Sequence, residues 1–195
     1  FPNNIKIFVD FAHTPDALLK VIKSLKGLYG ENISLVFGCG GDRDTKKRPL
    51  MAKIASLNCK KIYVTDDNPR NENPAKIRGE IVNNIKNKNC FNIGDRSKAI
   101  SYAIQNADPN EIILIAGKGH ETKQIYKNKI VNISDKNIVI RNKQKIKKIS
   151  DRDLNFLQNF KILQKIKKNP KIKNFHGIAI DSREVKKNNL FLTIK

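Results

Sequence analysis

The chain has 195 residues, 39% of them hydrophobic, which is enough for one complete domain with a buried core and part of a second. More than half of its formal net charge of +21 falls in residues 140–195. Because the sequence has neither an aromatic RNA-binding motif nor a zinc knuckle, we expect no specific nucleic-acid partner. No apolar run approaches the roughly 20 residues of a membrane span, and the three scattered cysteines lack metal-ligand spacing, so we expect a soluble, cytoplasmic protein with reduced thiols and no metal site in this chain.

Strand and helix patterns alternate over residues 1–142. Short apolar runs predict strands at residues 5–9, 33–37, 62–65, 91–93 and 111–116. Amphipathic or proline-opened segments predict helices at residues 16–28, 49–57, 74–85 and 97–106. Two short polar strands follow at 124–126 and 129–132, and then a helix at 135–142. This alternation predicts an α/β domain with a Rossmann-like, mostly parallel sheet and helices on both faces.

The remaining residues have a different character. Residues 143–150 are basic and predict a linker. Residues 151–168 have an amphipathic helical pattern, and residues 177–180 and 190–194 predict strands. Because these elements cannot form a core alone, we interpret residues 151–195 as the truncated α+β beginning of another domain.

Polar clusters follow four of the predicted strands, at the edge where open α/β sheets bind ligands. The first cluster, residues 10–16, has the sequence DFAHTPD. Asp10 could accept hydrogen bonds from ribose hydroxyls, and His13 could pack against a nucleotide. Alternatively, Asp10 and Thr14 only cap the following helix.

The second cluster, GCGGDRD at residues 38–44, is followed by KKRP at residues 46–49. Its glycines would let backbone amides approach an anion, and Arg43 and Arg48 would add positive charge. The third glycine is misplaced for the dinucleotide-binding fingerprint, which argues against a Rossmann oxidoreductase.

The third cluster, DDNPR at residues 66–70, combines two acids, an amide and a guanidinium on one proline-containing turn. Such a turn could recognise an amino acid, because Arg70 could hold a carboxylate through two parallel hydrogen bonds. The alternative is a turn that only closes a strand.

The fourth cluster, AGKGHE at residues 116–121, does not fit the P-loop pattern. Its glycine turn holds Lys118, His120 and Glu121, and it could meet a phosphate on one side and an ammonium group on the other. No nucleophile–base pair is evident, which favours ligand binding and phosphoryl or acyl activation over covalent catalysis.

Together these motifs resemble the C-terminal domain of the Mur ligases, and within them the MurE branch that adds meso-diaminopimelate. The matching segments, in order, are DFAHTPD (where the family more often has Tyr at position 11), GCGGDRD, KRPLM, TDDNPR, DRSKAI and AGKGHE. The resemblance implies an ATP- and Mg²⁺-dependent ligase of peptidoglycan synthesis. It would join diaminopimelate to UDP-MurNAc-L-Ala-D-Glu through an acyl phosphate.

Carried over residue by residue, the resemblance implies diaminopimelate binding by Arg43, Asn68, Arg70, Gly117 and Glu121, with Asp67 shaping the loop. Asp10 and His13 would lie on the ATP side. The P-loop and magnesium ligands of the family belong to a central domain outside this sequence, so it implies no catalytic or metal-binding residue here. A basic nucleic-acid-binding protein and a non-catalytic nucleotide-binding protein remain the alternatives.

The tail HGIAIDSREVKKNNLFLTIK, residues 176–195, is similar to the opening of a Mur ligase N-terminal, UDP-binding domain. There Ser182 would contact uracil. The order of the two segments implies a fusion to a second, MurF-like ligase that adds D-Ala-D-Ala, although a frameshift or gene-prediction artefact would produce the same string.

Overall fold

A five-stranded parallel sheet organises the first part of the chain. The computed structural model describes residues 1–146, 177–179 and 189–191. The sheet has the order β1-β5-β2-β3-β4, and every neighbouring pair runs parallel. Its strands are β1 (Lys6–Asp10), β2 (Ile33–Phe37), β3 (Lys61–Val64), β4 (Cys90–Asn92) and β5 (Ile112–Ala116). A short 3-10 helix, Pro2–Asn4, precedes β1.

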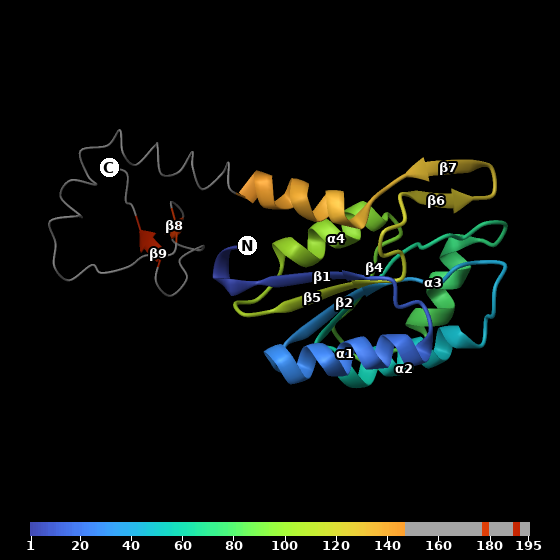
Figure 1. Ribbon diagram of the computed structural model, residues 1–195, viewed down its shortest axis with the longest axis horizontal. Coiled ribbons are helices and arrows are strands. Elements are labelled where there is room, and N and C mark those ends of the chain that lie inside the picture. Colours follow the sequence, from blue (N-terminus) through green and yellow to red (C-terminus); the bar gives the residue numbers. More distant parts are fainter. Residues whose placement is uncertain (147–176, 180–188, 192–195) are drawn as a thin grey trace, which may run out of the picture. The chain divides into compact units, whose positions relative to one another are not determined.

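Helices cover both faces of this sheet (Figure 1). One face carries α1 (Pro15–Tyr29), α2 (Lys47–Asn58) and α3 (Pro74–Val82), and the other carries α4 (Arg96–Gln105) and the helix of residues 135–146. The core under the first three helices joins Leu18, Met51 and Ile81 to Leu35 and Leu114 of the sheet. Because β2 and β5 are buried on both faces, their continuous apolar sequence is that of central parallel strands. The α/β prediction is confirmed.

An antiparallel hairpin lies at the carboxyl ends of the strands (Figure 1). It consists of β6 (Lys123–Tyr126) and β7 (Lys129–Asn132), as the two polar segments predicted. The isolated bridge between Arg70 and Tyr126 connects it to the loop after β3. The hairpin therefore holds that loop from outside the main sheet.

Several helix boundaries differ from the sequence-based ranges. Helix α2 begins two residues before Pro49, with Lys46 at the N-cap and no side-chain cap. Helix α3 ends at Val82 rather than residue 85, because Asn84 and Ile85 bond to carbonyls three residues back and close the last turn. Residues 143–146, predicted as linker, continue the preceding helix.

The chain divides into two compact units, Phe1–Lys145 and Ile146–Lys195. In the second, β8 (Gly177–Ala179) and β9 (Asn189–Phe191) form a parallel pair, close to the two predicted strands. The helix predicted at 151–168 and Ser182 lie outside the described residues.

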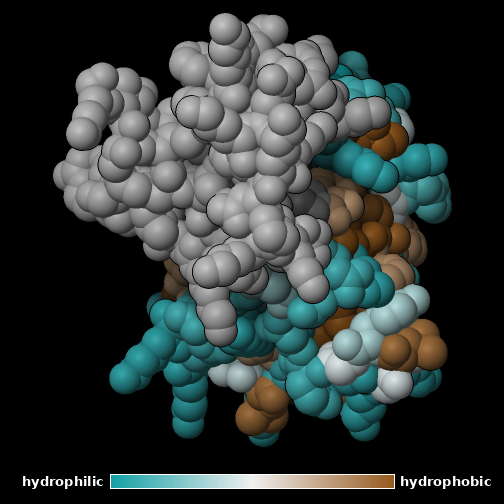
Figure 2. Space-filling view, turned by 90° about the vertical axis from the view of Figure 1, so that its left-hand side faces the viewer, coloured by the Kyte–Doolittle hydropathy of each residue, from teal (hydrophilic) through white to brown (hydrophobic). Residues whose placement is uncertain are grey.

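The surface agrees with the 29% charged composition. On the described part of the face in Figure 2, hydrophilic side chains lie between smaller apolar areas. Among the residues that the structure describes, no helix is long and apolar enough to cross a membrane.

Candidate functional site

The loops after β1, β2, β3 and β5 enclose a cavity of about 430 Å³ at the carboxyl edge of the sheet. It is lined by Asp67, predicted to shape the loop, and by the five residues predicted to contact the amino acid: Arg43, Asn68, Arg70, Gly117 and Glu121. His13 also lines the cavity. Asp10 is not among the lining residues. Its carboxylate accepts a hydrogen bond from the Ala12 amide at 2.7 Å and shapes the turn. Parallel strands bring these distant loops together because their carboxyl ends meet at one edge.

Asn68 has a fixed side-chain orientation in this cavity. Its Oδ1 accepts hydrogen bonds from Lys118 Nζ at 3.2 Å and from the Ile125 amide at 3.0 Å. Its Nδ2 donates to Glu121 Oε2 at 3.1 Å. Two donors at Oδ1 leave only Nδ2 able to donate to Glu121, so the network defines which end of the amide is which.

Lys118 is completely buried under the cavity. Besides Asn68, its ammonium group donates to Glu121 Oε2 at 2.9 Å and to the Lys123 carbonyl at 2.7 Å. Burial alone would raise the pKa of Glu121, but hydrogen bonds from Lys118 and Asn68 and the nearby charge of Arg70 hold that pKa below its ordinary value. Lys118 therefore does not face a phosphate, contrary to the sequence-based interpretation.

Arg70 adopts an unusual backbone conformation that the hairpin stabilises. Its φ is +51°, in the left-handed region, and its amide donates to the Ile125 carbonyl at 3.0 Å. Its Nη1 donates to the Gly41 carbonyl at 2.8 Å. Within the described residues, its Nε and Nη2 have no hydrogen-bond partner. Nη1 is thus anchored, and two nitrogens, Nε and Nη2, remain to donate to a ligand.

The neighbouring aspartates of this loop belong to different cavities. Asp66 pairs with Arg78 and accepts a hydrogen bond from the Tyr126 hydroxyl at 3.0 Å, in a second cavity of about 750 Å³. Asp67 lines the smaller cavity, and no described residue donates a hydrogen bond to its carboxylate. The smaller cavity thus contains hydrogen-bond donors, on Arg70, and an acceptor, the Asp67 carboxylate, that have no partner among the described residues.

Gly117 makes room for Asp67. Its φ is +112°, and a Cβ built on it would lie 2.8 Å from Asp67 Oδ2. Only glycine combines this backbone conformation with such a close approach. Gly41 is similarly constrained, because its Cβ would lie 1.9 Å from the Pro69 carbonyl oxygen.

The positive charge predicted for the glycine loop is only partly available. Arg43 is exposed and lines the cavity. Arg48, in contrast, is completely buried and donates to Glu72 at 2.8 Å and to Glu80 at 2.7 Å, as well as to the Gly40 carbonyl. Arg48 therefore fastens the glycine loop to α3, and the expectation that it would meet an anion is wrong.

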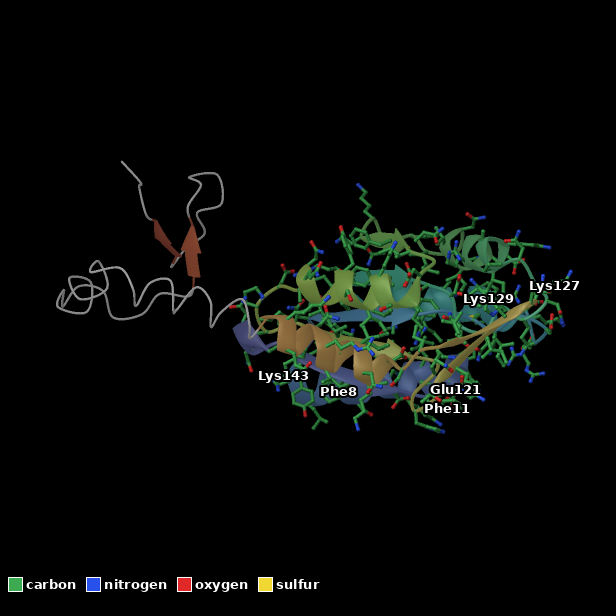
Figure 3. The ribbon with its side chains drawn as sticks, turned by 90° about the horizontal axis from the view of Figure 1, so that it is seen from above. Phe8, Phe11, Glu121, Lys127, Lys129 and Lys143 are labelled. Atoms are coloured by element: carbon green, nitrogen blue, oxygen red, sulfur yellow. The ribbon has the colours of Figure 1, made fainter. Side chains whose placement is uncertain are left out.

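One rim of the cavity is aromatic. The Phe11 ring lies 4.7 Å from that of His13 and 5.7 Å from that of His120, measured between centroids. Figure 3 shows Phe11 at the same end of the domain as Glu121, with Lys127 and Lys129 farther out on the hairpin.

Two hydrogen bonds hold the loop after β1. Lys47 Nζ donates to the His13 carbonyl at 2.9 Å. The Thr14 hydroxyl accepts from the Ala17 amide and caps α1, as the capping alternative predicted for Thr14.

A family comparison gives this geometry its context. The family described as "Mur ligase, glutamate ligase domain" matches residues 2–119, more than half of the chain. The chain belongs to this family. The resemblance that the sequence motifs indicated is confirmed at this level.

Individual relatives show which Mur ligases this domain is similar to. It is 53% identical over 133 residues to the UDP-N-acetylmuramoyl-L-alanyl-D-glutamate–2,6-diaminopimelate ligase of Buchnera aphidicola from Acyrthosiphon pisum, covering 68% of this chain and 27% of that protein. It is 47% identical over 141 residues to the Haemophilus influenzae (strain PittGG) ligase of the same name, covering 72% of this chain and 29% of that protein. A solved structure of a ligase with this name matches with a TM-score of 0.67 and 38% identity, over 71% of this chain and 29% of the other. The chain thus spans less than a third of the length of these relatives.

Sequence reasoning missed the structural role of two buried residues beside this cavity. Lys118 and Gln124 are buried polar residues that support the DDNPR loop, with Gln124 Nε2 donating to the Asp66 carbonyl at 3.0 Å. A lysine between two glycines directly after a buried strand is the local signal for Lys118. Gln124 offers no such signal, because its partner is 58 residues away.

Proposed function

We propose that residues 1–142 are the amino-acid-binding domain of a ligase that adds meso-diaminopimelate to UDP-MurNAc-L-Ala-D-Glu in peptidoglycan synthesis. The proposal rests on one observation above all. The smaller cavity combines a partly free guanidinium, that of Arg70, with a carboxylate held ionised, that of Glu121. This combination suits a ligand that carries both carboxylate and ammonium groups. The names of the similar proteins point to the same substrate.

Each end of the amino acid would have its own partners. Arg70 and Arg43 would hold a carboxylate, with the remaining Asn68 Nδ2 hydrogen as a further donor. Glu121 and Asp67 would accept from an ammonium group. Lysine has an ammonium group where diaminopimelate has its second amino-acid head, so it would leave one guanidinium contact unmade.

The chemistry would be ATP-driven amide formation. The D-glutamate carboxylate attacks the γ-phosphate of ATP and releases ADP, the diaminopimelate amine attacks the resulting acyl phosphate, and inorganic phosphate leaves as the amine loses its proton. Magnesium would shield the phosphates. Within the described residues no group of three His, Cys, Asp or Glu could hold a metal ion. The family resemblance implies that the magnesium ligands belong to the central domain. His13, on the aromatic rim, would face the nucleotide, with Asp10 shaping its loop.

The deciding experiment measures phosphate release by the complete protein with ATP, magnesium and UDP-MurNAc-L-Ala-D-Glu. We expect release with meso-diaminopimelate and little with L-lysine. Equal phosphate release with lysine would support the ligase activity but contradict the proposed specificity of the Arg70 guanidinium for a carboxylate. No release with either amino acid would favour a non-catalytic nucleotide-binding protein, and salt-sensitive RNA or DNA binding would favour the nucleic-acid alternative.

We also propose that residues 151–195 begin a UDP-binding domain of a second, MurF-like ligase, with Ser182 at the uracil. The support is the motif at residues 176–195 and the parallel pairing of β8 with β9. Mass spectrometry of the protein isolated from its native cells tests this. A single polypeptide carrying both ligases is expected, and a product ending near the end of this chain would reject the fusion.

A further inference from the structure

We propose that Lys118 is a positioning residue that sets the polarity of the amino-acid cavity from beneath, an inference that rests on the proposed function. Lys118 is not among the residues that line the cavity, and its side chain is 1% exposed. Its ammonium group instead contacts two residues that do line it, Asn68 and Glu121. The lysine therefore acts on a ligand only through these two side chains.

The first effect concerns the orientation of the Asn68 amide. The two ends of this amide differ only in whether they donate or accept hydrogen bonds. Lys118 and the Ile125 amide are both donors, and both point at Oδ1. With the amide reversed, two donors would face the Nδ2 group, a costly arrangement in a buried site. Lys118 thereby keeps Asn68 a donor on the cavity side, as a ligand carboxylate requires.

The second effect concerns the charge of Glu121. Desolvation favours the neutral acid, whereas the hydrogen bond from Lys118 favours the carboxylate, and the resulting pKa lies below the ordinary value. Because Lys118 and Asn68 both bond to Oε2, Oε1 remains to accept from an ammonium group. Lys118 thus prepares both an acceptor and a donor for a zwitterion.

The same ammonium group also holds the hairpin in register with the site. It donates to the Lys123 carbonyl at the start of β6, and two residues later Ile125 bonds to Asn68 through its amide and to Arg70 through its carbonyl. One buried atom, Lys118 Nζ, therefore joins the loop after β3, the loop after β5 and the hairpin.

The test replaces the charge while keeping most of the volume, in the complete protein. For Lys118→Met we expect the KM for diaminopimelate to rise about tenfold or more, the scale of one or two hydrogen bonds to charged groups. The KM values for ATP and for the UDP-linked substrate should stay within about twofold of the wild type, because the hydrogen bonds of the Lys118 ammonium group reach Asn68, Glu121 and Lys123 and no residue that we assign to the nucleotide. Lys53→Met, an exposed substitution on α2, is the matched control and should change none of them.

Two further measurements separate positioning from a purely structural role. In an Asn68→Ala background, Lys118→Met should raise the KM for diaminopimelate much less than in the wild type, because part of its effect passes through Asn68. In Lys118→Met alone, the KM should also increase as the pH falls through the released, higher pKa of Glu121, whereas the wild type stays flat in that range.

The possible outcomes distinguish this inference from the proposed function. If the wild-type protein does not use diaminopimelate, the proposed function fails. If it does, but Lys118→Met folds and keeps its KM, or raises all three KM values equally, or has a fully additive effect with Asn68→Ala, the positioning role is wrong.

Discussion

The loop after β3 separates two cavities that differ in how their charges are used. In the larger one, of about 750 Å³, Asp66 pairs with Arg78 and the lining Arg96 pairs with Asp135. In the smaller one, of about 430 Å³, Arg70 keeps unpaired donors and Asp67 an unpaired carboxylate among the described residues. The larger cavity also carries the exposed Arg141, so the contrast concerns the buried charges of its wall. Our proposal that the smaller cavity is the binding site therefore rests on the free donors of Arg70 and the free carboxylate of Asp67 rather than on volume.

The largest expected effect tests whether the larger cavity is structural. Arg96 and Asp135 are both completely buried and share two hydrogen bonds, of 2.8 and 2.7 Å. Asp135→Ala leaves a buried guanidinium without its partner, and we expect it to lower the free energy of unfolding by about 3–5 kcal/mol. Urea denaturation measures this. A loss below about 1 kcal/mol would show that the pair does not hold this wall of the cavity together.

The next effect tests whether the smaller cavity is the binding site. Arg70→Ala should raise the KM for diaminopimelate by roughly 10- to 100-fold, because hydrogen bonds between charged groups are each worth about 1.5–3 kcal/mol. The KM for ATP should remain unchanged. Arg141→Ala, which removes a guanidinium from the larger cavity, is the control. Equal effects of the two substitutions on diaminopimelate would erase the distinction between the cavities.

A smaller effect concerns the backbone that supports the site. Gly117→Ala places a Cβ close to Asp67 at a φ of +112° and should cost about 1–3 kcal/mol of stability. Gly79→Ala, in α3 where a Cβ meets nothing within 4 Å, should instead stabilise the domain by about 0.5–1 kcal/mol. Thermal denaturation of both variants checks the opposite signs, and two changes of the same sign would contradict the reasoning.

The smallest expected effect is a pH dependence outside both cavities. A hydrogen bond from Arg48 opposes burial and holds the pKa of Glu72 below its ordinary value of 4.5. The resulting stabilisation is present above that value and is lost as the pH falls through the lowered pKa of the folded protein. Glu72→Gln should therefore flatten the decline of stability in acid, measured by urea denaturation at a series of pH values. An unchanged decline would assign it to other carboxylates.

Much of the site could be predicted from the sequence because the fold is built from local patterns. Apolar runs and amphipathic spacing identified the strands and helices, and parallel strands necessarily bring their carboxyl-end loops together. Arg43, Asn68, Arg70 and Glu121 could therefore be assigned to one cavity although they are spread over 79 residues. The helix boundaries were less certain, as the end of α3 shows, because the last turn depends on which carbonyls find donors.

The direction of each side chain was a different matter. Asp66 and Asp67 are neighbours with the same chemistry, yet they line different cavities. Arg43 and Arg48 looked like equivalent positive charges in the sequence. Of the two, only Arg48 forms ion pairs within the described residues, with Glu80 in α3 and with Glu72 in the loop before that helix.

The sequence by itself thus determined the element types, the parallel sheet, the family and the set of loops around the site. Only the tertiary structure decided which polar residues are free and which are used inside the protein. The physical reason is that hydrogen bonds such as Lys118 to Asn68, across 50 residues, depend on how separate elements pack. A local pattern of residues predicts the helices and strands, whereas the pairing of buried charges depends on how those elements pack in the folded protein.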